Sequence, residues 1–402
     1  MEIDDVRDRA RPTPQPASAD MANEWIPFNV AHVAPEDEAR VIEALRSGHL
    51  CGDGDFTRQC HEIFKDRFGV AGALLTHSCT AALEMTALLL ELEPGDEVIL
   101  PSYTFVSTAN AFVLRGATPV FVDVRPDTLN IDEAKIEAAV TDRTKAIVTV
   151  HYAGVPCEMD AINAIARKHG FAVIEDAAQA YGSTYKGRPA GALADMAAFS
   201  FHHTKNISAG EGGALLCRDE ALARRAEILR EKGTNRSAME RGEVDKYTWV
   251  DIGSSYLPSE LNAALLLGQL ERADRINARR LEIWRTYNEA LAENADDVDV
   301  TLPTVPADCR HNGHCFYFLA PDETTRNALI AHFKTQGVKT VFHYVPLHSS
   351  TGGEKFGRTS GDMSVTDDVW RRLVRLPLYV DLTDEQVARV IAAYRSFWPR
   401  SA

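Results

Sequence analysis

The chain contains 402 residues, of which 45% are hydrophobic and 25% are charged, so it can bury a sizeable core in two or three domains. Its formal net charge of -15 argues against a protein that wraps nucleic acid, because duplex binding depends largely on Lys and Arg side chains that neutralise phosphates. The cysteines show no paired CxxC spacing and follow no secretory leader, which predicts reduced thiols in a cytoplasmic protein without a metal site. No apolar run reaches the roughly 18 to 20 residues of a membrane helix, so membrane insertion is not expected.

The N-terminal part of the chain changes character after about twenty residues. Residues 1–22 mix acids and arginines with several prolines and lack an apolar stretch, which predicts a disordered extension. A first helix is predicted over 35–47, because a proline and acids open its first turn and Gly48 follows its end.

Short apolar runs bounded by turn residues then recur along the chain, a pattern typical of buried strands. They are 73–75, 98–100, 120–122, 146–150, 173–174, 197–201 and 214–216. Helical stretches lie between several of them, at 80–92, 107–115 and 158–169. Strands that alternate with helices predict an α/β fold with a mostly parallel central sheet and helices on both faces. We expect this larger domain to span 23–257.

The remainder, 258–402, is predicted to hold bridging helices and a smaller α+β domain. Strong helix formers fill 260–291. Strand-like runs follow at 315–319 and 339–342, separated by a helical stretch at 324–336. Thr383 and Gln386 have the spacing of a capping box, which predicts the start of a final helix.

Two side chains with useful chemistry follow predicted strands. Asp176 ends the run VIED, at the carboxyl end of a strand, where open α/β sheets bind ligands. Lys205 follows the apolar run AFSF and precedes the glycine-rich turn GEGG. An acid at a strand end is more often a helix cap, and most lysines are solvated, so neither residue identifies a site alone.

A third feature is the turn THSCT, which joins a predicted strand to a predicted helix. The amides of Cys79 and Thr80 can meet a phosphate there, at the positive end of the helix. The simpler interpretation is that Ser78 or Thr80 caps the helix. Both interpretations can hold, because a cap and an anion site use the same free N–H groups.

Taken together, these segments resemble the DegT/DnrJ family of sugar aminotransferases, fold type I enzymes that depend on pyridoxal 5'-phosphate (PLP). SFHHTKN with GEGG is similar to the family's Schiff-base lysine motif, and EDAAQ to its pyridine-binding motif. The resemblance extends from about Trp25 to Trp398. It implies that Lys205 carries PLP and acts as acid and base, that Asp176 holds the pyridine nitrogen and that Gln179 contacts the ring hydroxyl.

The resemblance also implies the remaining contacts of the site. Phe105 would stack on the cofactor ring, although the residue alone is equally typical of an aromatic in the core. The expected phosphate ligands are Ser78, Cys79, Thr80 and Ser200. The expected substrate contacts are Tyr103, His343 and Tyr344, although a histidine beside an apolar strand is more often structural.

One position departs from the broader family. Many members carry Gly-Tyr-Asn, and the Asn reaches the cofactor phosphate of the partner subunit, whereas this chain has Ser255 at that place. The resemblance therefore implies a weaker contact at Ser255. A homodimer with shared active sites remains the expectation.

Within the family, segments such as LCGDGDFTRQC, DKYTWVDIGSSYL and VFHYVPLH resemble the branch that makes dTDP-4-amino-4,6-dideoxygalactose. This implies transfer of an amino group from glutamate to C4 of dTDP-4-keto-6-deoxyglucose, in polysaccharide biosynthesis. Amination of a different nucleotide-linked keto sugar stays open. Lys205 argues against a PLP-dependent sugar dehydratase, which carries a histidine there. The intact Lys205, Asp176 and Gln179 disfavour a non-catalytic PLP-binding regulatory protein.

Overall fold

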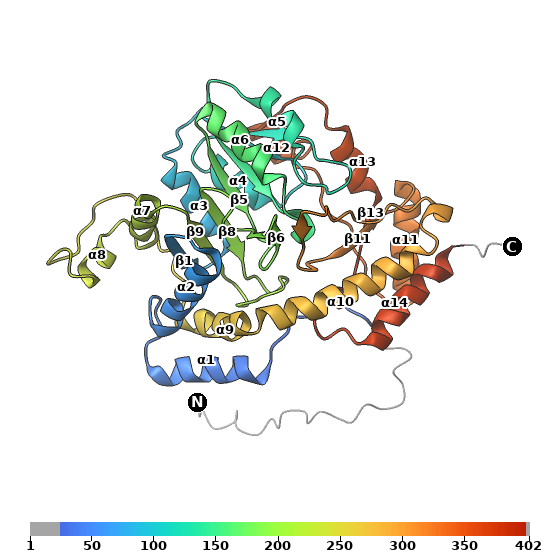
Figure 1. The fold of residues 1–402 in the computed structure, drawn as a ribbon, viewed down its shortest axis with the longest axis horizontal. Helices are drawn as coiled ribbons and strands as arrows, with labels where there is room; N and C mark the ends of the chain where they lie inside the picture. The colour runs from blue at the N-terminus through green and yellow to red at the C-terminus, as the bar shows by residue number, and fades with distance from the viewer. Residues whose placement is uncertain (1–24, 399–402) are drawn as a thin grey trace, which may run out of the picture.

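The central feature of the computed structural model, which describes residues 25–398, is an eight-stranded sheet (Figure 1). Its strands, in spatial order, are β1 (Gly72–Thr76), β9 (Gly213–Cys217), β8 (Met196–Ser200), β5 (Ala172–Asp176), β4 (Thr144–Val150), β2 (Glu97–Pro101), β3 (Thr118–Val122) and β12 (Arg358–Thr359). Only β9 runs antiparallel to its neighbours. The predicted mostly parallel sheet is confirmed, and each strand predicted up to residue 216 is present. The predicted extension 1–22 lies outside the described residues.

Alternation along the strands sends side chains into two separate cores. In β2, Ile99 packs into one core, while Val98 and Leu100 pack into the other. The first core is covered by helices α1 (Pro35–Ser47), α2 (Asp55–Phe68), α5 (Glu133–Ala139), α6 (Met159–His169) and α9 (Glu260–Glu271). The second is covered by α3 (Cys79–Leu89), α4 (Val106–Val113) and α7 (Glu220–Arg230). The prediction of helices on both faces is therefore confirmed.

The predicted long helical segment is present as two helices. α9 ends at Glu271, and α10 (Ala273–Ala292) begins after Arg272, whose φ of -113° departs from helical geometry. α10 carries the chain away from the central sheet (Figure 1).

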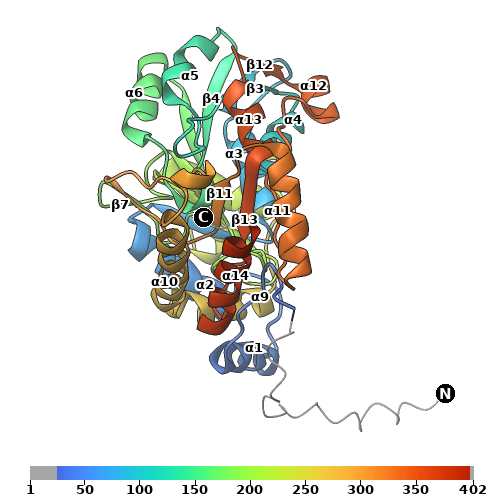
Figure 2. The ribbon, with the colours of Figure 1, turned by 90° about the vertical axis from the view of Figure 1, so that its right-hand side faces the viewer.

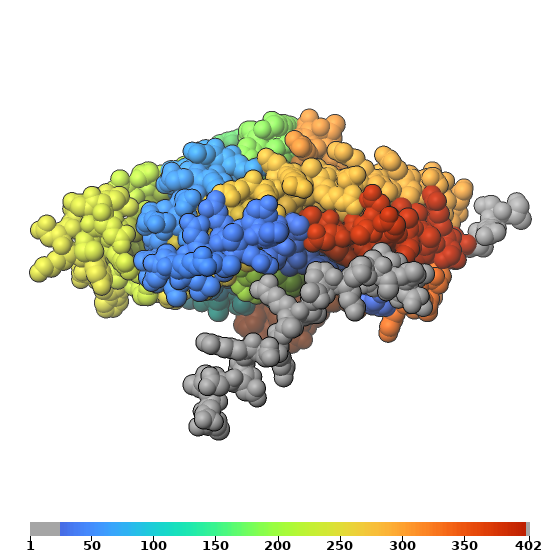
Figure 3. All heavy atoms as spheres, turned by 90° about the horizontal axis from the view of Figure 1, so that it is seen from below, coloured from blue at the N-terminus to red at the C-terminus, as the bar shows by residue number. Residues whose placement is uncertain are grey.

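The C-terminal part forms a third core around a two-stranded antiparallel sheet of β11 (Phe316–Leu319) and β13 (Leu373–Leu376). Figure 2 shows β13 beside α11 (Glu323–Thr335) and α14 (Asp384–Phe397). The predicted capping box opens α14. Ile26 belongs to this core and bridges to Val338, and Figure 3 shows N-terminal residues (blue) beside C-terminal residues (red) on one face of the molecule. The exact domain boundaries, 23–257 and 258–402, stay a prediction.

The strand predicted at 339–342 is wrong. Only Val341 pairs there, through an isolated bridge to Arg375. The other edge of β13 already belongs to β11, and Phe342 remains 45% exposed with the Arg326 guanidinium over its ring. Strand-forming residues such as Thr340 and Val341 are therefore insufficient, because a strand also needs a neighbour along its whole length.

Several helices and the short paired strands were not predicted. Besides α2, α5 and α7, they include α8 (Arg236–Glu240), α12 (Thr351–Phe356), α13 (Ser364–Arg372), the 3₁₀ turn Tyr152–Gly154, β6 (Thr184–Tyr185), β7 (Arg188–Pro189) and β10 (Cys309–Arg310). Across residues 25–398, no helix combines the length and apolar character that a membrane crossing requires.

Candidate functional site

A cavity of about 450 Å³ opens where β5 and β8 end and where the C-terminal core meets the central sheet. Most of the predicted site residues line it. They are Ser78, Cys79, Thr80, Phe105, Asp176, Gln179, Ser200, Lys205, His343 and Tyr344. The cavity thus lies at the carboxyl ends of parallel strands, the usual place for a ligand in such a sheet.

Asp176 is the buried carboxylate of this cavity. It is the last residue of β5 and is only 6% exposed. The Thr108 hydroxyl donates to Oδ2 (2.7 Å), and the Ala178 amide donates to Oδ1 (3.1 Å). Burial raises the pKa of Asp176, although both hydrogen bonds and the charge of Lys205 work in the opposite direction. A cationic donor placed against this carboxylate would therefore be strongly favoured.

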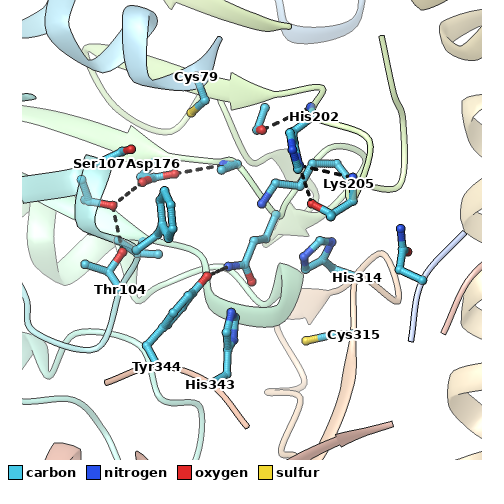
Figure 4. Close-up of a pocket in the computed structure, with 18 of the residues that line it drawn as sticks. Cys79, Thr104, Ser107, Asp176, His202, Lys205, His314, Cys315, His343 and Tyr344 are labelled. Carbon is cyan, nitrogen blue, oxygen red and sulfur yellow. Dashed lines mark hydrogen bonds between the residues drawn. The ribbon is translucent and has the colours of Figure 1, made fainter. Parts of the chain in front are cut away.

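Lys205 extends into the cavity on the side where Asp176 lies (Figure 4). It follows β8 in a turn closed by its own amide, which donates to the His202 carbonyl (2.9 Å). Burial lowers the pKa of the Lys205 amine, while Cys79 and Asp176 partly oppose this shift. The amine is consequently neutral over a wider pH range than an ordinary lysine, as a nucleophile or a base must be.

The N-terminus of α3 forms a further wall. Ser78 caps the helix, because its Oγ accepts from the Ala81 amide (3.1 Å), and the Thr80 hydroxyl donates to Ser107 (2.8 Å). Within residues 25–398, the amides of Cys79 and Thr80 have no hydrogen-bond acceptor. The helix cap and an anion site are therefore compatible here. The cap uses the Ala81 amide, and the amides of Cys79 and Thr80 remain free to bind an anion.

Gln179 and Tyr344 form a connected polar pair in the cavity, and Figure 4 shows Tyr344 at its lower edge. The Gln179 Oε1 accepts from the Ala153 amide (2.7 Å), and its Nε2 donates to the Tyr344 hydroxyl (3.2 Å). Tyr103 lies behind this edge and does not line the cavity. It is fully buried, and its hydroxyl donates to the His343 carbonyl. Tyr103 therefore supports the segment that carries His343 and Tyr344.

Phe105 and Ser255 differ in how the structure places them. Phe105 precedes α4, lines the cavity and is 57% exposed, with its ring 6.4 Å from that of Tyr344. Ser255 is exposed, lies outside this cavity and pairs with Glu231 through an isolated bridge. A role for Ser255 in its own subunit's cavity is therefore not supported by this geometry.

Several cavity residues were not predicted from the sequence. Thr104 and Thr108 hydrogen-bond to each other (2.8 Å), and their spacing of one helical turn in the segment PSYTFVST is a signal that could have found them. The other unpredicted cavity residues include Phe28, Asn29, His202, Arg280, His314, Cys315 and Arg375. Most of these come from distant segments, so only the tertiary fold brings them to the cavity.

Comparisons with known proteins agree with this architecture. Residues 32–395 match the DegT/DnrJ/EryC1/StrS aminotransferase family. The spore coat polysaccharide biosynthesis protein SpsC of Bacillus subtilis is 39% identical over 382 residues, which cover 93% of this chain and 97% of SpsC. The aminotransferase TlmJ of Streptoalloteichus hindustanus is 32% identical with a TM-score of 0.83, covering 94% of this chain and 98% of TlmJ.

A third relative, Spr1654 of Streptococcus pneumoniae, has been solved in a PLP-form. It is 27% identical with a TM-score of 0.85, and the match covers 92% of this chain and 98% of that one. The predicted fold class is thereby confirmed as fold type I, the α/β fold of PLP-dependent aminotransferases.

Proposed function

Because the chain belongs to the DegT/DnrJ/EryC1/StrS aminotransferase family, and is thus a PLP-dependent sugar aminotransferase, we propose that it transfers the amino group of L-glutamate to C4 of dTDP-4-keto-6-deoxy-D-glucose. The products are dTDP-4-amino-4,6-dideoxy-D-galactose and 2-oxoglutarate. The observation that carries the proposal is the convergence of the Lys205 amine, the Asp176 carboxylate and the free amides of α3 on one cavity. The resemblance of several segments to one branch of the family supports the particular sugar.

The donor set of the cavity fits PLP. The free amides of Cys79 and Thr80, with Ser78 and Ser200 beside them, suit the phosphate. Asp176 suits the protonated pyridine nitrogen, which also relieves the cost of burying this carboxylate. The remaining roles are Gln179 at the ring hydroxyl, Phe105 at the ring face and Lys205 at the aldehyde. When bound, PLP supplies an electron sink for the carbon that loses or gains a proton.

The protein's own part in the reaction is proton transfer and the positioning of the carboxylate that faces the cofactor. Lys205 Nζ would take the proton from the α-carbon of the amino donor and hold it for return within the same half-reaction. In the second half-reaction Nζ moves a proton in the opposite direction, to C4 of the sugar. Its lowered pKa keeps a neutral amine available for both steps. The Thr108 hydroxyl and the Ala178 amide hold the Asp176 carboxylate in place throughout.

We further infer that the enzyme works as a cytoplasmic homodimer in polysaccharide biosynthesis. Phe105 is 57% exposed beside the cavity, as expected of a residue that a ligand or a second subunit covers. The nucleotide sugar would enter past His343 and Tyr344 at the cavity edge, where Tyr103 holds their segment. Ser255, which lies outside this cavity, would face the partner's cofactor.

The proposal is tested with Lys205→Ala. We expect this variant to retain the pyridoxamine form of the cofactor, because the amides of α3, Asp176 and Gln179 bind without the lysine. It should fail to convert dTDP-4-keto-6-deoxyglucose in a single turnover, with a rate lower by at least about 100-fold, since no base replaces Nζ. Conversion at the wild-type rate would show that the catalytic lysine is misplaced. A panel of dTDP-, UDP- and GDP-linked 4-keto sugars, read by mass spectrometry, tests the choice of sugar.

A further inference from the structure

Lys205 is followed by a buried residue, Asn206, that joins the turn of the lysine to the C-terminal part of the chain. Asn206 is 6% exposed. Its Nδ2 donates to the main-chain carbonyl of Asn312 (3.0 Å) and to Oδ1 of Asn277 on α10 (2.9 Å). A carbonyl oxygen can only accept, so these bonds fix the orientation of the Asn206 amide. Its Oδ1 is therefore an acceptor, and the group that meets this oxygen must donate.

That group is His314, whose Nδ1 lies 2.9 Å from Asn206 Oδ1. Because Oδ1 accepts, Nδ1 carries the hydrogen. Burial lowers the pKa of His314 well below its ordinary value, and the positive charges of Lys205 and two arginines of the cavity add to this shift, so the ring is neutral. A neutral imidazole with its hydrogen on Nδ1 has a lone pair on Nε2. The contact with Asn206 thus makes Nε2 an acceptor.

The backbone of His314 is fixed by a second buried amide. Its N–H donates to Oδ1 of Asn312 (3.0 Å), a residue that is 2% exposed. The Nδ2 of Asn312 donates in turn to the carbonyls of Gln179 (2.9 Å) and Tyr181 (3.1 Å), which follow β5. The imidazole therefore cannot shift without breaking several buried hydrogen bonds, and its position relative to the end of β5 is fixed.

The remaining nitrogen of the ring faces the cavity. His314 is only 6% exposed and lines the cavity, so the exposed part of its ring lies there, and Figure 4 shows it beside Lys205. In the part of the chain that the structure describes, Nδ1 is bonded to Asn206 and no donor reaches Nε2. A nearly buried acceptor without a partner is expected to meet a donor when the site is in use.

The Lys205 amine is a donor of the same cavity that also has no partner. Among the described residues, no acceptor lies within hydrogen-bond distance of Nζ and no carboxylate pairs with it. Both carboxylate oxygens of Asp176 and the Oε1 of Gln179 already accept hydrogen bonds. The charge of Lys205 affects the His314 ring, so the two side chains are close to each other. Nζ and Nε2 are thus free groups of opposite hydrogen-bonding character.

We propose that His314 is a positioning residue for Lys205: its Nε2 accepts an N–H bond of the free lysine amine and directs the lone pair of Nζ toward the carbon that loses its proton. This inference rests on the proposed amino transfer. An amine on a flexible four-carbon stem rotates freely, and only one orientation allows the transfer. After the transfer Nζ is charged, and a hydrogen bond from a charged donor is stronger than one from a neutral donor. His314 therefore stabilises the protonated lysine without taking its proton.

Two substitutions of His314 in the holoenzyme separate the Nε2 acceptor from the rest of the ring. Asn places an amide nitrogen near Nδ1 and can still donate to Asn206, whereas Gln places an amide oxygen near Nε2. We expect His314→Asn to bind PLP and to melt like wild type, yet to complete both half-reactions about 10- to 100-fold more slowly at saturating substrate. The glutamate concentration for half-maximal rate should change less than about twofold. His314→Gln should recover part of the rate, because it keeps an acceptor.

A deuterium isotope effect reports the proton transfer itself. With glutamate deuterated at the α-carbon, single-turnover conversion by His314→Asn should show a larger isotope effect than conversion by wild type, because a poorly oriented amine makes this transfer limit the rate more strongly. A purely structural role would reduce the amount of active enzyme and leave the isotope effect unchanged.

The matched control is His311→Asn. His311 packs edge-on against Trp284 (4.5 Å between ring centres) and is not among the residues that line the cavity. Its Nδ1 accepts from the Gly313 amide (3.3 Å), a bond that an Asn oxygen can replace. His311→Asn should therefore keep the wild-type rate at saturating substrate and the wild-type isotope effect.

A crystal structure of the wild-type protein with pyridoxamine phosphate, in which the lysine amine is free, tests the contact without turnover. Nζ should lie about 2.7 to 3.2 Å from His314 Nε2. Unchanged rates in His314→Asn, equal slowing of the Asn and Gln variants, or Nζ bonded to a different acceptor would overturn the role of His314. A loss confined to the sugar half-reaction would also overturn it and would assign Nε2 to a substrate hydroxyl. If the wild-type enzyme converts no amino acid, the proposed function fails instead, and the crystal structure still decides whether His314 holds the lysine.

Discussion

The ionised form of Asp176, which the proposed function requires, is the form that burial destabilises. Its burial raises its pKa, so the ionised carboxylate that the cofactor requires is disfavoured in the protein without cofactor. Replacement by Asn keeps the shape and removes the charge. We expect Asp176→Asn to fold, to retain PLP and to lose at least about 100-fold in turnover, because a neutral partner no longer keeps the pyridine nitrogen protonated. Steady-state kinetics would measure the loss, and near-normal turnover would remove Asp176 from its role.

The same residue predicts a pH dependence of stability in the cofactor-free enzyme. A carboxyl group with a raised pKa binds its proton more tightly in the folded than in the unfolded state. Its contribution to stability is therefore present at low pH and is lost as pH rises above 3.8 and through the raised pKa. We expect Asp176→Asn to melt at a higher temperature than wild type at pH 7, with the difference shrinking toward pH 4. A constant difference across this pH range would contradict the explanation.

At the level of residues, Lys205 and Asp176 were predictable because the segments SFHHTKN and EDAAQ resemble family motifs; their positions after apolar runs agreed with this but did not identify the site alone. Both residues line the cavity. Arg375 could not be predicted this way, because it lies in an ordinary short strand and its position depends on how the C-terminal core meets the sheet. Tyr103 was predicted to contact the substrate and lies close to the cavity residues in sequence. Its side chain is fully buried, however, and does not line the cavity.

At the level of elements, the turn before α3 packs directly against the backbone of Gly213 in β9. An added Cβ on Gly213 would stand 2.4 Å from the Ser78 carbonyl carbon and 2.5 Å from the Cys79 nitrogen, distances that no packing tolerates. We therefore expect Gly213→Ala to displace this turn and to weaken PLP binding by at least about tenfold, because the phosphate would lose the two free amides. Equilibrium dialysis of the cofactor measures this change.

A matched substitution separates this effect from a general loss of glycine. Gly352 in α12 has open space where a Cβ would stand and no positive φ, so Gly352→Ala should bind PLP like wild type. Equal PLP affinity in Gly213→Ala and wild type would mean that the phosphate does not depend on the turn at Cys79.

Helices and strands were predictable from the sequence where nearby residues are enough to stabilise them. β4 is a long β-branched run, and α14 begins with a capping box, so both carry their own signals. The stretch 339–342 also contains strand-forming residues but pairs only at Val341, and no local pattern reveals how much of a stretch will find a partner strand. β12 was not predicted because it is too short to have a sequence pattern of its own. It is a strand only because two of its residues pair with β3 at the edge of the sheet.

For the whole molecule, the distribution of charge matters more than its total. The net charge of -15 would repel dicarboxylates and nucleotide diphosphates at long range. One wall of the cavity reverses this sign locally through Arg280 and Arg375, while the cavity's two carboxylates contact other groups, Asp176 the Thr108 hydroxyl and Glu211 the His202 ring. Anionic substrates are thus bound by a positive site within an acidic protein, and salt should affect their encounter rate more than their affinity.

The segment after α7 predicts how two copies of the chain associate. α8 and the residues that follow it project from the body of the molecule (Figure 1), and they carry exposed apolar side chains. These are Val244, Tyr247, Trp249, Val250 and Ile252, of which Trp249 is 78% exposed. An exposed apolar group of this size on a projecting arm is typical of a protein interface. We expect the full chain to sediment as a dimer, at about twice 44.3 kDa.

Substitution within this arm tests that expectation. Trp249→Glu should shift the equilibrium toward monomer by about 30-fold or more, because a buried aromatic at an interface typically contributes at least about 2 kcal/mol and the new carboxylate would be desolvated. The control is Phe356→Glu, which alters a similarly apolar, exposed aromatic (45%) on α12, away from α8 in Figure 1, and should remain dimeric. Sedimentation equilibrium over a range of concentrations measures both. A wild-type monomer would refute the expected dimer, and equal dimerisation of both variants would place the interface elsewhere. If the active sites are shared, the Trp249→Glu monomer should also lose transamination while keeping a folded central sheet.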